Sequence, residues 1–523
     1  MNQSRTWQII LKQIGSFLIL LSIVMVAPSI FALFYHELYS LIGFLISAII
    51  TAAIGFSLYY GFHKTDEPVY NQALLIAAYG YAAIAFFGGF PFFIIAMLTP
   101  EAVMANLIPA GATYTESSLV YFREPIHCLF ESMSAFTTTG LTMAVHEPSI
   151  GKALLFYRSL SQWVGGAGFI IMVLALFRHT PARSAILLYT SESTGERLKP
   201  KVVETTRAIW KVYLILTLFS ALYLTIGTII ILPQYPVKEI LFDAINHAMA
   251  GQSTGGFSTL DDSIAGYQSV YMEMLYLLPM ILGSFSIPFY YRIIFEAKYR
   301  EIWRDIQTRN LIIAFILGAG IQSYLLLNAG TISSPVREGV FQFISAMTTT
   351  GWQTSNIASW DWLSHIFIIF AAMIIGGASG ATVGGIKIIR ALIIKKGLQW
   401  QITKTFLSDH TIKNIRFNAR MMLPNEMNEE FTKASSLAIM FIVTILFCAI
   451  ASQLILGNQI SFTESLFESA SAQATVGLSV GITDPSMPKS LETIYIIQMW
   501  IGRLEVIPVF ALIRAIFWGT KPR

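Results

Sequence analysis

Charged residues are scarce in this sequence. Lys, Arg, Asp and Glu together make up 12% of the 523 residues, whereas a typical soluble domain has about 25%. Hydrophobic residues make up 55% of the chain. A soluble globule could not bury that much apolar surface and cover the remainder with so few charges. The composition therefore excludes a cytosolic enzyme, a secreted disulfide scaffold and a disordered protein, and it indicates an integral membrane protein.

Cysteine and histidine are also few. The two cysteines, Cys128 and Cys448, lie in apolar context far apart in the sequence, which favours two separate thiols over a disulfide. The eight histidines include no pair at i and i+4, so no spacing typical of a structural zinc site is present. The net charge of +4 is too small to indicate nucleic-acid binding. Without a phosphate-binding loop, a nucleotide fingerprint or catalytic-triad spacing, we expect neither an enzyme nor a cofactor bound by this chain.

Long apolar runs recur from residue 14 to the C-terminus. A helix of about 20 apolar residues crosses a bilayer core, and backbone polarity excludes open strands there. The first run is longer than the apolar region of a signal peptide and a second run follows at once, so we expect an anchor rather than a cleaved leader. The predicted spans are 14–34, 39–62, 72–98, 152–178, 209–232, 270–297, 310–328, 363–395, 433–456 and 491–517.

Basic residues gather on one side of these predicted spans, and few lie on the other. Because cytoplasmic loops carry the excess of Lys and Arg, both termini are expected in the cytoplasm. The basic stretches 180–207 and 397–432 have two interpretations, either a signal for topology alone or a docking surface for a cytoplasmic partner.

Four short segments between the predicted spans are too apolar for solvent-exposed loops and too short to cross the membrane: 124–145, 238–259, 335–354 and 460–481. Alignment on one glycine gives the strips SAFTTTG (134–140), AGQSTGG (250–256), SAMTTTG (345–351) and SAQATVG (471–477). A second glycine follows 25 residues later at Gly165, Gly376 and Gly502, and 27 residues later at Gly283. Four copies at one register indicate a fourfold internal repeat.

Each repeat is expected to be a span, a short helix that enters from outside and stops halfway, an extended strip and a second span. Such backbone is tolerated at membrane depth only where protein buries it or water lines it. A ring of carbonyls can replace the hydration shell of a monovalent cation, and glycine allows the close approach. The candidate ion-binding residues are the last three of each strip: Thr138, Thr139, Gly140, Thr254, Gly255, Gly256, Thr349, Thr350, Gly351, Thr475, Val476 and Gly477.

With these strips the sequence resembles the superfamily of Trk, Ktr and HKT potassium transporters, and most closely its TrkH type. The resemblance implies one ion pathway whose filter glycines are Gly140, Gly256, Gly351 and Gly477. Sodium-selective HKT relatives have Ser at the first position, so Gly140 favours potassium as the transported ion. The resemblance also implies a homodimer in the bacterial cytoplasmic (inner) membrane that binds a cytoplasmic nucleotide-binding regulatory subunit of the TrkA type.

The fold class that we predict is an all-α integral membrane protein, with two extra N-terminal helices and four membrane–pore–membrane repeats in pseudo-fourfold symmetry around one central ion pathway. The expected parts are two N-terminal helices (1–70), pore repeat 1 (71–180), pore repeat 2 (205–300), pore repeat 3 (308–398), a cytoplasmic basic linker (399–432) and pore repeat 4 (433–523).

A glycine-rich stretch, GGASGATVGGIK at 376–387, lies inside the predicted span after the third strip. Its glycines should interrupt a helix, since each costs about 1 kcal/mol relative to Ala. The stretch either packs helices closely through small residues or forms a loop inside the membrane. The resemblance implies the second, an intramembrane gate that only the third repeat is long enough to form. The candidate gate residues are Gly376, Gly377, Gly380, Gly384, Gly385 and Lys387.

Arg503 lies within the last predicted span, with Glu505 two residues further on. A central Arg costs about 2.5–3.5 kcal/mol on insertion scales, so its side chain is expected to face protein or water. One interpretation pairs it with Glu505, although residues i and i+2 do not face each other on a helix. The resemblance implies instead a place beside the gate, where its charge would repel a cation.

A polar column occurs nine positions before each filter glycine, on the short helices, and comprises Glu131, His247, Gln342 and Glu468. Bracing hydrogen bonds are the favoured interpretation of this column, and ion contact is the alternative.

The predicted function is potassium uptake by channel-like conduction under an intramembrane gate, with transport either passive or coupled to protons or sodium. The alternative is a coupled secondary transporter, for cation symport or a small organic solute, although such folds usually have two inverted repeats. A membrane-embedded enzyme would need a cluster of ionisable groups inside the spans, where we find Arg503 and Glu505.

Overall fold

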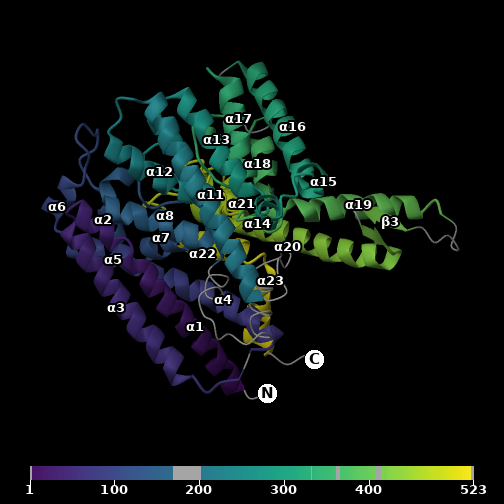
Figure 1. Ribbon diagram of the computed structural model, residues 1–523, viewed down its shortest axis with the longest axis horizontal. Helices are drawn as coiled ribbons and strands as arrows, with labels where there is room; N and C mark the ends of the chain where they lie inside the picture. The colour runs from purple at the N-terminus through teal and green to yellow at the C-terminus, as the bar shows by residue number, and fades with distance from the viewer. Residues whose placement is uncertain are drawn as a thin grey trace.

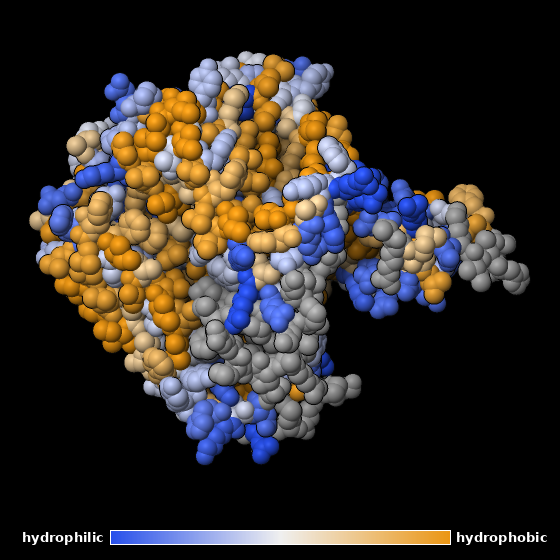
Figure 2. Space-filling view, in the orientation of Figure 1, coloured by the Kyte–Doolittle hydropathy of each residue, from blue (hydrophilic) through white to orange (hydrophobic). Residues whose placement is uncertain are grey.

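The structure is a computed structural model that describes residues 3–66, 68–168, 202–330, 332–360, 365–407, 414–418 and 420–519. Helices dominate these residues, and the strands among them form two short pairs. Figure 2 shows apolar side chains over most of the visible face of the body, with hydrophilic residues at its lower end, along its upper left rim and on a projecting arm. The chain is therefore an all-α membrane protein, as predicted.

Two N-terminal helices pack against each other outside the repeats, α1 (Gln3–Val26) and α3 (Leu38–Gly61), with the short α2 (Ser29–Phe34) between them. A Cβ atom on Gly15 would lie 2.8 Å from the carbonyl oxygen of Gly55. Small residues therefore let the two backbones meet closely, as in other membrane helix pairs. Figure 1 shows α1 and α3 running side by side along one flank of the molecule.

Each of the four repeats contains a spanning element, a short helix and a second helix, which is broken in repeats 2, 3 and 4. The elements of repeat 1 are α4 (Tyr70–Gly88), α5 (Phe90–Leu98), α6 (Glu101–Asn106), η1 (Ser118–Arg123), α7 (Pro125–Thr137), η2 (Glu147–Ile150) and α8 (Lys152–Ala167). Those of repeat 2 are α11 (Val202–Ile231), α12 (Val237–Gln252), η3 (Ser263–Tyr267), α13 (Val270–Ser284) and α14 (Ile287–Glu296), followed by α15 (Glu301–Arg304).

The later repeats carry the described strands. Repeat 3 consists of α16 (Ile306–Ala329), α17 (Pro335–Met347), η4 (Ile357–Ser359), α18 (Phe367–Ile374), β1 (Ile375–Gly376), β2 (Ile386–Lys387) and α19 (Ile388–Lys404). After β3 (Ile415–Phe417) and β4 (Arg420–Met422), repeat 4 consists of α20 (Pro424–Leu456), η6 (Gly457–Gln459), α21 (Phe462–Gln473), α22 (Lys489–Arg503) and α23 (Ile507–Trp518).

The short helices α7, α12, α17 and α21 have 12 to 16 residues. At 1.5 Å per residue they are about 18–24 Å long, which is too short for a bilayer core of about 30 Å. Proline starts α7 and α17, and a capping box between Ser461 and Glu464 starts α21. Local sequence therefore sets where these helices begin, and the strip that follows each one sets where it ends.

The second helix of a repeat breaks close to the second glycine of the pattern. Helices α13 and α14 meet at 94°, and α22 and α23 meet at 114°. The prediction of continuous spanning helices over 270–297 and 491–517 was therefore wrong. Pro288 restarts the helix in repeat 2, while Glu505 and Val506 take positive φ in repeat 4, a conformation that ends a helix.

Six helical stretches of the described chain are long and apolar enough to cross a membrane, and each of the two bent pairs could form one more span. The other two predicted spans differ for separate reasons. The predicted span 152–178 extends beyond α8 into residues outside the described part of the chain. The predicted span 363–395 is interrupted between α18 and α19 by the glycine-rich stretch.

A projecting arm is formed by α19, the antiparallel pair β3–β4 and the beginning of α20 (Figure 1). Its small apolar core consists of Trp400, Ile415, Met422 and Met427. The predicted basic linker falls on this arm, apart from residues 408–413 and 419, which lie outside the described residues. The other basic stretch, 180–207, is described only from residue 202.

Candidate functional site

The four strips close into one ring. A Cβ atom on Gly140 would lie 2.4 Å from the Gly255 oxygen, and one on Gly256 would lie 1.9 Å from the Thr350 oxygen. A Cβ atom on Gly351 would lie 1.8 Å from the Val476 oxygen, and one on Gly477 would lie 2.3 Å from the Thr139 oxygen. Each glycine therefore faces the carbonyl of the next repeat, and the fourth repeat returns to the first. This closed order places all four strips around a single axis.

The strips share one backbone conformation. The four ring glycines have φ between 80° and 92°, which L side chains rarely adopt. Gly256, rather than the adjacent Gly255, has this conformation in repeat 2. The threonine two positions earlier is also left-handed in each repeat, with φ between 51° and 58°; these residues are Thr138, Thr254, Thr349 and Thr475. Space and backbone conformation thus both require glycine at the ring.

Helix α7 ends directly before its left-handed threonine, and α12, α17 and α21 end one residue earlier. The residue preceding each ring glycine donates its N–H to a carbonyl in the last turn of the helix, with N–O distances of 2.8 to 3.0 Å. The bonds join Thr139 to Ser134, Gly255 to Ala250, Thr350 to Ser345 and Val476 to Ser471. The C-terminal ends of four helices therefore meet at the ring, where their partial negative charge favours a cation.

The polar column of the short helices braces the chain just beyond the ring. Each member accepts the backbone N–H of the residue three positions after the ring glycine. Glu131 accepts from Met143 at 2.8 Å, and Glu468 accepts from Val480 at 3.0 Å. His247 accepts from Thr259 at 3.4 Å, and the Gln342 amide oxygen, facing its two backbone donors, accepts from Thr354 at 2.8 Å. The bracing interpretation of this column is confirmed.

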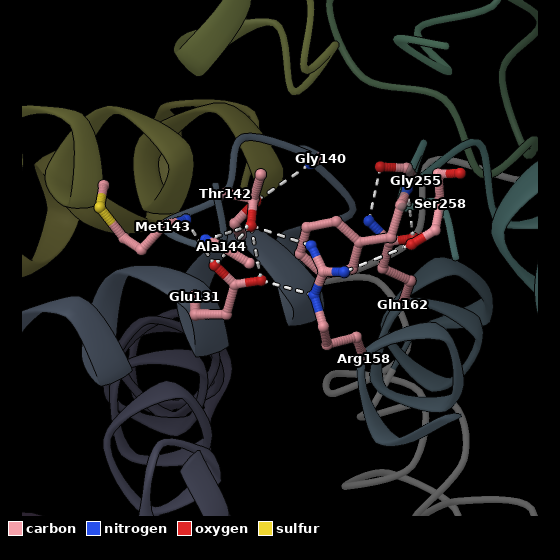
Figure 3. A network of polar contacts seen from close by, with 11 residues as sticks. Glu131, Gly140, Thr142, Met143, Ala144, Arg158, Gln162, Gly255 and Ser258 are labelled. Atoms are coloured by element: carbon pink, nitrogen blue, oxygen red, sulfur yellow. Dashed lines mark hydrogen bonds and ion pairs between the residues drawn. The ribbon is translucent and has the colours of Figure 1, made fainter. Parts of the chain in front are cut away.

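Arg158, on α8, joins the strips of repeats 1 and 2 (Figure 3). Its guanidinium donates to Glu131 at 2.7 Å, to the Thr142 hydroxyl at 2.9 Å and to the Ser258 carbonyl at 3.3 Å. It also stacks 4.0 Å from the centre of the Phe257 ring. Arg158 is only 1% exposed, so a buried cation holds two strips in fixed relation.

Gln162, one turn further along α8, completes this boundary (Figure 3). Its amide nitrogen donates to the Gly255 carbonyl at 2.5 Å, and its amide oxygen accepts from the Phe257 N–H at 3.1 Å. One side chain therefore holds the residues on both sides of Gly256. No counterpart of these bonds was predicted, because they join positions more than 90 residues apart.

Arg158 could have been found from the sequence, because it lies inside the predicted span 152–178. An Arg in a membrane span is costly to insert, so its side chain is expected to face protein or water, as was argued for Arg503. Lys387 and Arg390 lie inside the predicted span 363–395 in the same way. Restricting the ionisable groups of the spans to Arg503 and Glu505 was therefore wrong. Arg390 forms an ion pair with Glu505.

The glycine-rich stretch forms a non-helical loop directly beneath the threonines. Its ends, β1 and β2, pair in parallel, so close packing of a continuous helix through small residues is excluded. The Gly384 N–H donates to the Thr349 hydroxyl at 2.9 Å, and the Thr382 hydroxyl lies 3.3 Å from that of Thr254. A Cβ atom on Gly384 would lie 2.1 Å from the Thr475 hydroxyl. The loop thus meets three of the four threonines.

Arg503 contacts the fourth of these left-handed threonines, Thr138. Its guanidinium donates to the Thr138 hydroxyl at 3.2 Å, to the Thr382 carbonyl at 3.1 Å and to the Gly166 carbonyl at 2.9 Å, and also to the Gly165 carbonyl. The loop and this arginine together lie beneath the ring of strips. Lys387 is buried at the end of the loop and donates to the Val383 carbonyl.

A cavity of about 520 Å³ lies on the other side of the ring. The four ring glycines form part of its lining, together with residues that follow each of them in sequence. Residues that precede the glycines contact the loop instead, so the ring separates this outer vestibule from the loop. The candidate ion-binding residues and the candidate gate residues are therefore stacked along one path.

Comparisons with known proteins agree with this architecture. The TrkH family, described as cation transport protein, matches residues 91–518. A cation transporter of Methanocaldococcus jannaschii is 28% identical, covering 98% of this chain and 96% of its own length. The Trk system potassium uptake protein TrkH of Escherichia coli is 26% identical, covering 97% and 99%. The crystal structure of the potassium transporter TrkH from Vibrio parahaemolyticus superposes with a TM-score of 0.79 at 23% identity, over 99% of this chain and all of that one.

Proposed function

Because the chain belongs to the TrkH family of cation transport proteins, we propose that it takes up potassium ions by conducting them through the ring of the four strips. The observation that carries this proposal is the closed cyclic order in which each ring glycine faces the carbonyl of the next repeat. Four carbonyl oxygens around one axis can replace the hydration shell of a monovalent cation. Relatives in several bacteria are potassium uptake proteins, which favours potassium over other monovalent cations.

The ion-binding residues in this proposal are the twelve that end the four strips, which contribute backbone oxygens and no charge. Uncharged oxygens suit an ion that must bind and leave quickly, whereas carboxylates in the ring would retain a divalent ion. The braced outer backbone supports this role, because selectivity requires the oxygens to keep their spacing.

The gate in this proposal is the glycine-rich loop together with Arg503 and Lys387. Hydrogen bonds from Thr382, Gly384 and Arg503 hold the loop against the strips, and a guanidinium beneath the ring repels a cation that leaves it. Opening requires these bonds to break together. We assign the described conformation to the closed state.

The assembly that we propose is a homodimer in the bacterial inner membrane with both termini in the cytoplasm. The beginning of α1 and the end of α23 lie at the same end of the molecule (Figure 1), which agrees with an even number of crossings. A nucleotide-binding regulatory subunit of the TrkA type would act on the gate from the cytoplasm, since this chain has no nucleotide-binding motif of its own.

Uptake of radioactive rubidium into liposomes that contain only the purified protein tests this proposal. We expect uptake that potassium competes away and that sodium competes poorly, without an imposed proton or sodium gradient. Accumulation that requires such a gradient would favour a coupled transporter, and solute uptake without cation flux would contradict the proposal. Gly140→Ser sharpens the test, because we expect it to raise competition by sodium.

A further inference from the structure

The outer vestibule is acidic. Three of its lining residues have ionisable side chains, and all three are acidic: Glu147, Asp261 and Asp262. Glu147 begins η2, just before α8, whereas the two aspartates follow the strip of repeat 2. A lining that contains carboxylates and no Lys or Arg focuses a negative potential in front of the ring and raises the local concentration of cations.

Glu147 is the distinctive member of this group. It is only 8% exposed, and its Oε2 atom has no hydrogen-bond partner in the described structure. A buried carboxylate oxygen without a partner costs free energy unless a cation or a proton compensates it. The hydrogen bonds of the nearby Arg158 run to Glu131, Thr142 and the Ser258 carbonyl. Glu147, which lines the vestibule, therefore keeps a carboxylate oxygen that no described donor satisfies.

Asp261 is held in place around the same vestibule. Its carboxylate lies 3.8 Å from His146 Nδ1, and the His146 ring stacks on Tyr114 with centroids 3.7 Å apart. The His146 backbone N–H donates to the Ser118 hydroxyl at 2.7 Å. The Asp261 side chain keeps 34% of its surface exposed, so an ion beside it would retain part of its water.

We propose that Glu147 and Asp261 form an outer binding site for a monovalent cation, from which the ion enters the ring. The inference rests on the proposed conduction through the ring. At about 30 Å³ per water molecule, the cavity of about 520 Å³ accommodates an ion with its first hydration shell.

Rubidium uptake by proteoliposomes at a series of rubidium concentrations tests this site. The variants are Glu147→Gln, Asp261→Asn and the double variant. We expect the half-saturating concentration to rise about tenfold in the double variant, at the lower end of the effect of a charged cleft on local ion concentration. The maximal rate should change little, because the ring and the gate are intact.

The matched control is Glu124→Gln, which removes an exposed carboxylate that pairs with Lys489 at 2.6 Å outside the vestibule lining. We expect its half-saturating concentration to equal that of the unmodified protein. Repeating the series at high ionic strength, set with an impermeant organic cation, separates a binding site from diffuse attraction, which salt screens.

Each result decides between the two proposals. Absence of uptake by the unmodified protein overturns conduction and, with it, the outer site. Normal uptake by the unmodified protein with unchanged half-saturation in the variants overturns the outer site alone, as does a rise that disappears at high ionic strength. If Glu147→Gln fails to fold, as size-exclusion chromatography would show, the exposed Asp261→Asn variant carries the test.

Discussion

The two sides of the ring contrast sharply. On the outer side, the four repeats keep one backbone, with left-handed glycines, capped short helices and a polar column that braces the same N–H in every copy. On the inner side the repeats diverge, with sharp bends in repeats 2 and 4 and a loop in repeat 3. Under the proposed function, near-symmetry serves selection of the ion, because a ring needs equal oxygens. A gate needs only one element that moves, so symmetry can be lost there.

The largest expected effect comes from breaking the outer symmetry at the ring. Gly351→Ala would place a Cβ atom 1.8 Å from the Val476 oxygen at a residue with φ of 83°, so the ring cannot keep its spacing. We expect rubidium uptake to fall to the level of empty liposomes. Gly320→Ala is the control, since no atom lies within 4 Å of a Cβ atom there. Normal uptake by a folded Gly351→Ala variant would contradict the role of the ring.

The second largest effect is expected from substitution of Arg158, which joins the strips of repeats 1 and 2. Arg158→Gln leaves Glu131 buried without its cation, and breaking a buried pair costs about 3–5 kcal/mol. We expect a lower midpoint of thermal unfolding and increased competition by sodium in uptake assays. Glu131→Gln combined with Arg158→Gln should recover part of the midpoint, because no unpaired charge remains. Lys433→Gln, on an exposed pair with Glu429, should match the unmodified protein.

On the inner side, Arg503→Ala should raise flux. The substitution removes the bonds to Thr138 and Thr382, and loss of about 1.4 kcal/mol of closed-state stabilisation shifts the gate about tenfold. Initial rates of rubidium uptake measure this change. Arg514→Ala provides the control, because Arg514 is exposed on α23. Unchanged flux in a folded Arg503→Ala variant would contradict the proposed role of Arg503 in the gate.

The smallest effect is expected in the vestibule, as a dependence on external pH. Burial raises the pKa of Glu147 well above its usual range, and burial also raises the pKa of Asp261. Both carboxyls therefore become neutral at a higher pH than ordinary ones. We expect the half-saturating rubidium concentration to increase as the external pH falls, and to increase less in the double variant Glu147→Gln, Asp261→Asn.

The charged groups around these two carboxyls are His146 and Asp262 beside Asp261, and Arg158, Glu131 and Asp261 itself around Glu147. His146 Nδ1 lies 3.8 Å from the Asp261 carboxylate and therefore contributes to the electrostatic potential there. His146→Asn separates its contribution from that of the carboxyls. A half-saturating concentration that does not change with pH would contradict the prediction.

Hydrophobic runs predicted most spans, because a helix that crosses a bilayer needs about 20 apolar residues whatever its neighbours in the fold. The bends of the second helices were not predictable from such runs. The Ile287 N–H at the bend of repeat 2 donates to the Gly380 carbonyl of the loop at 2.9 Å, so that bend depends on a partner nearly a hundred residues away. Bonds of this kind leave no periodic signal.

By itself, the sequence determined the membrane location, the fourfold repeat and the residues that end each strip, because these depend on composition and on local backbone needs such as glycine at positive φ. Tertiary structure alone decided that the strips close in cyclic order, that Arg158 and Gln162 join two repeats, and that Thr382 and Arg503 meet beneath the threonines. Those features join side chains to backbone atoms that are distant in the chain, and only folding determines which of them become neighbours.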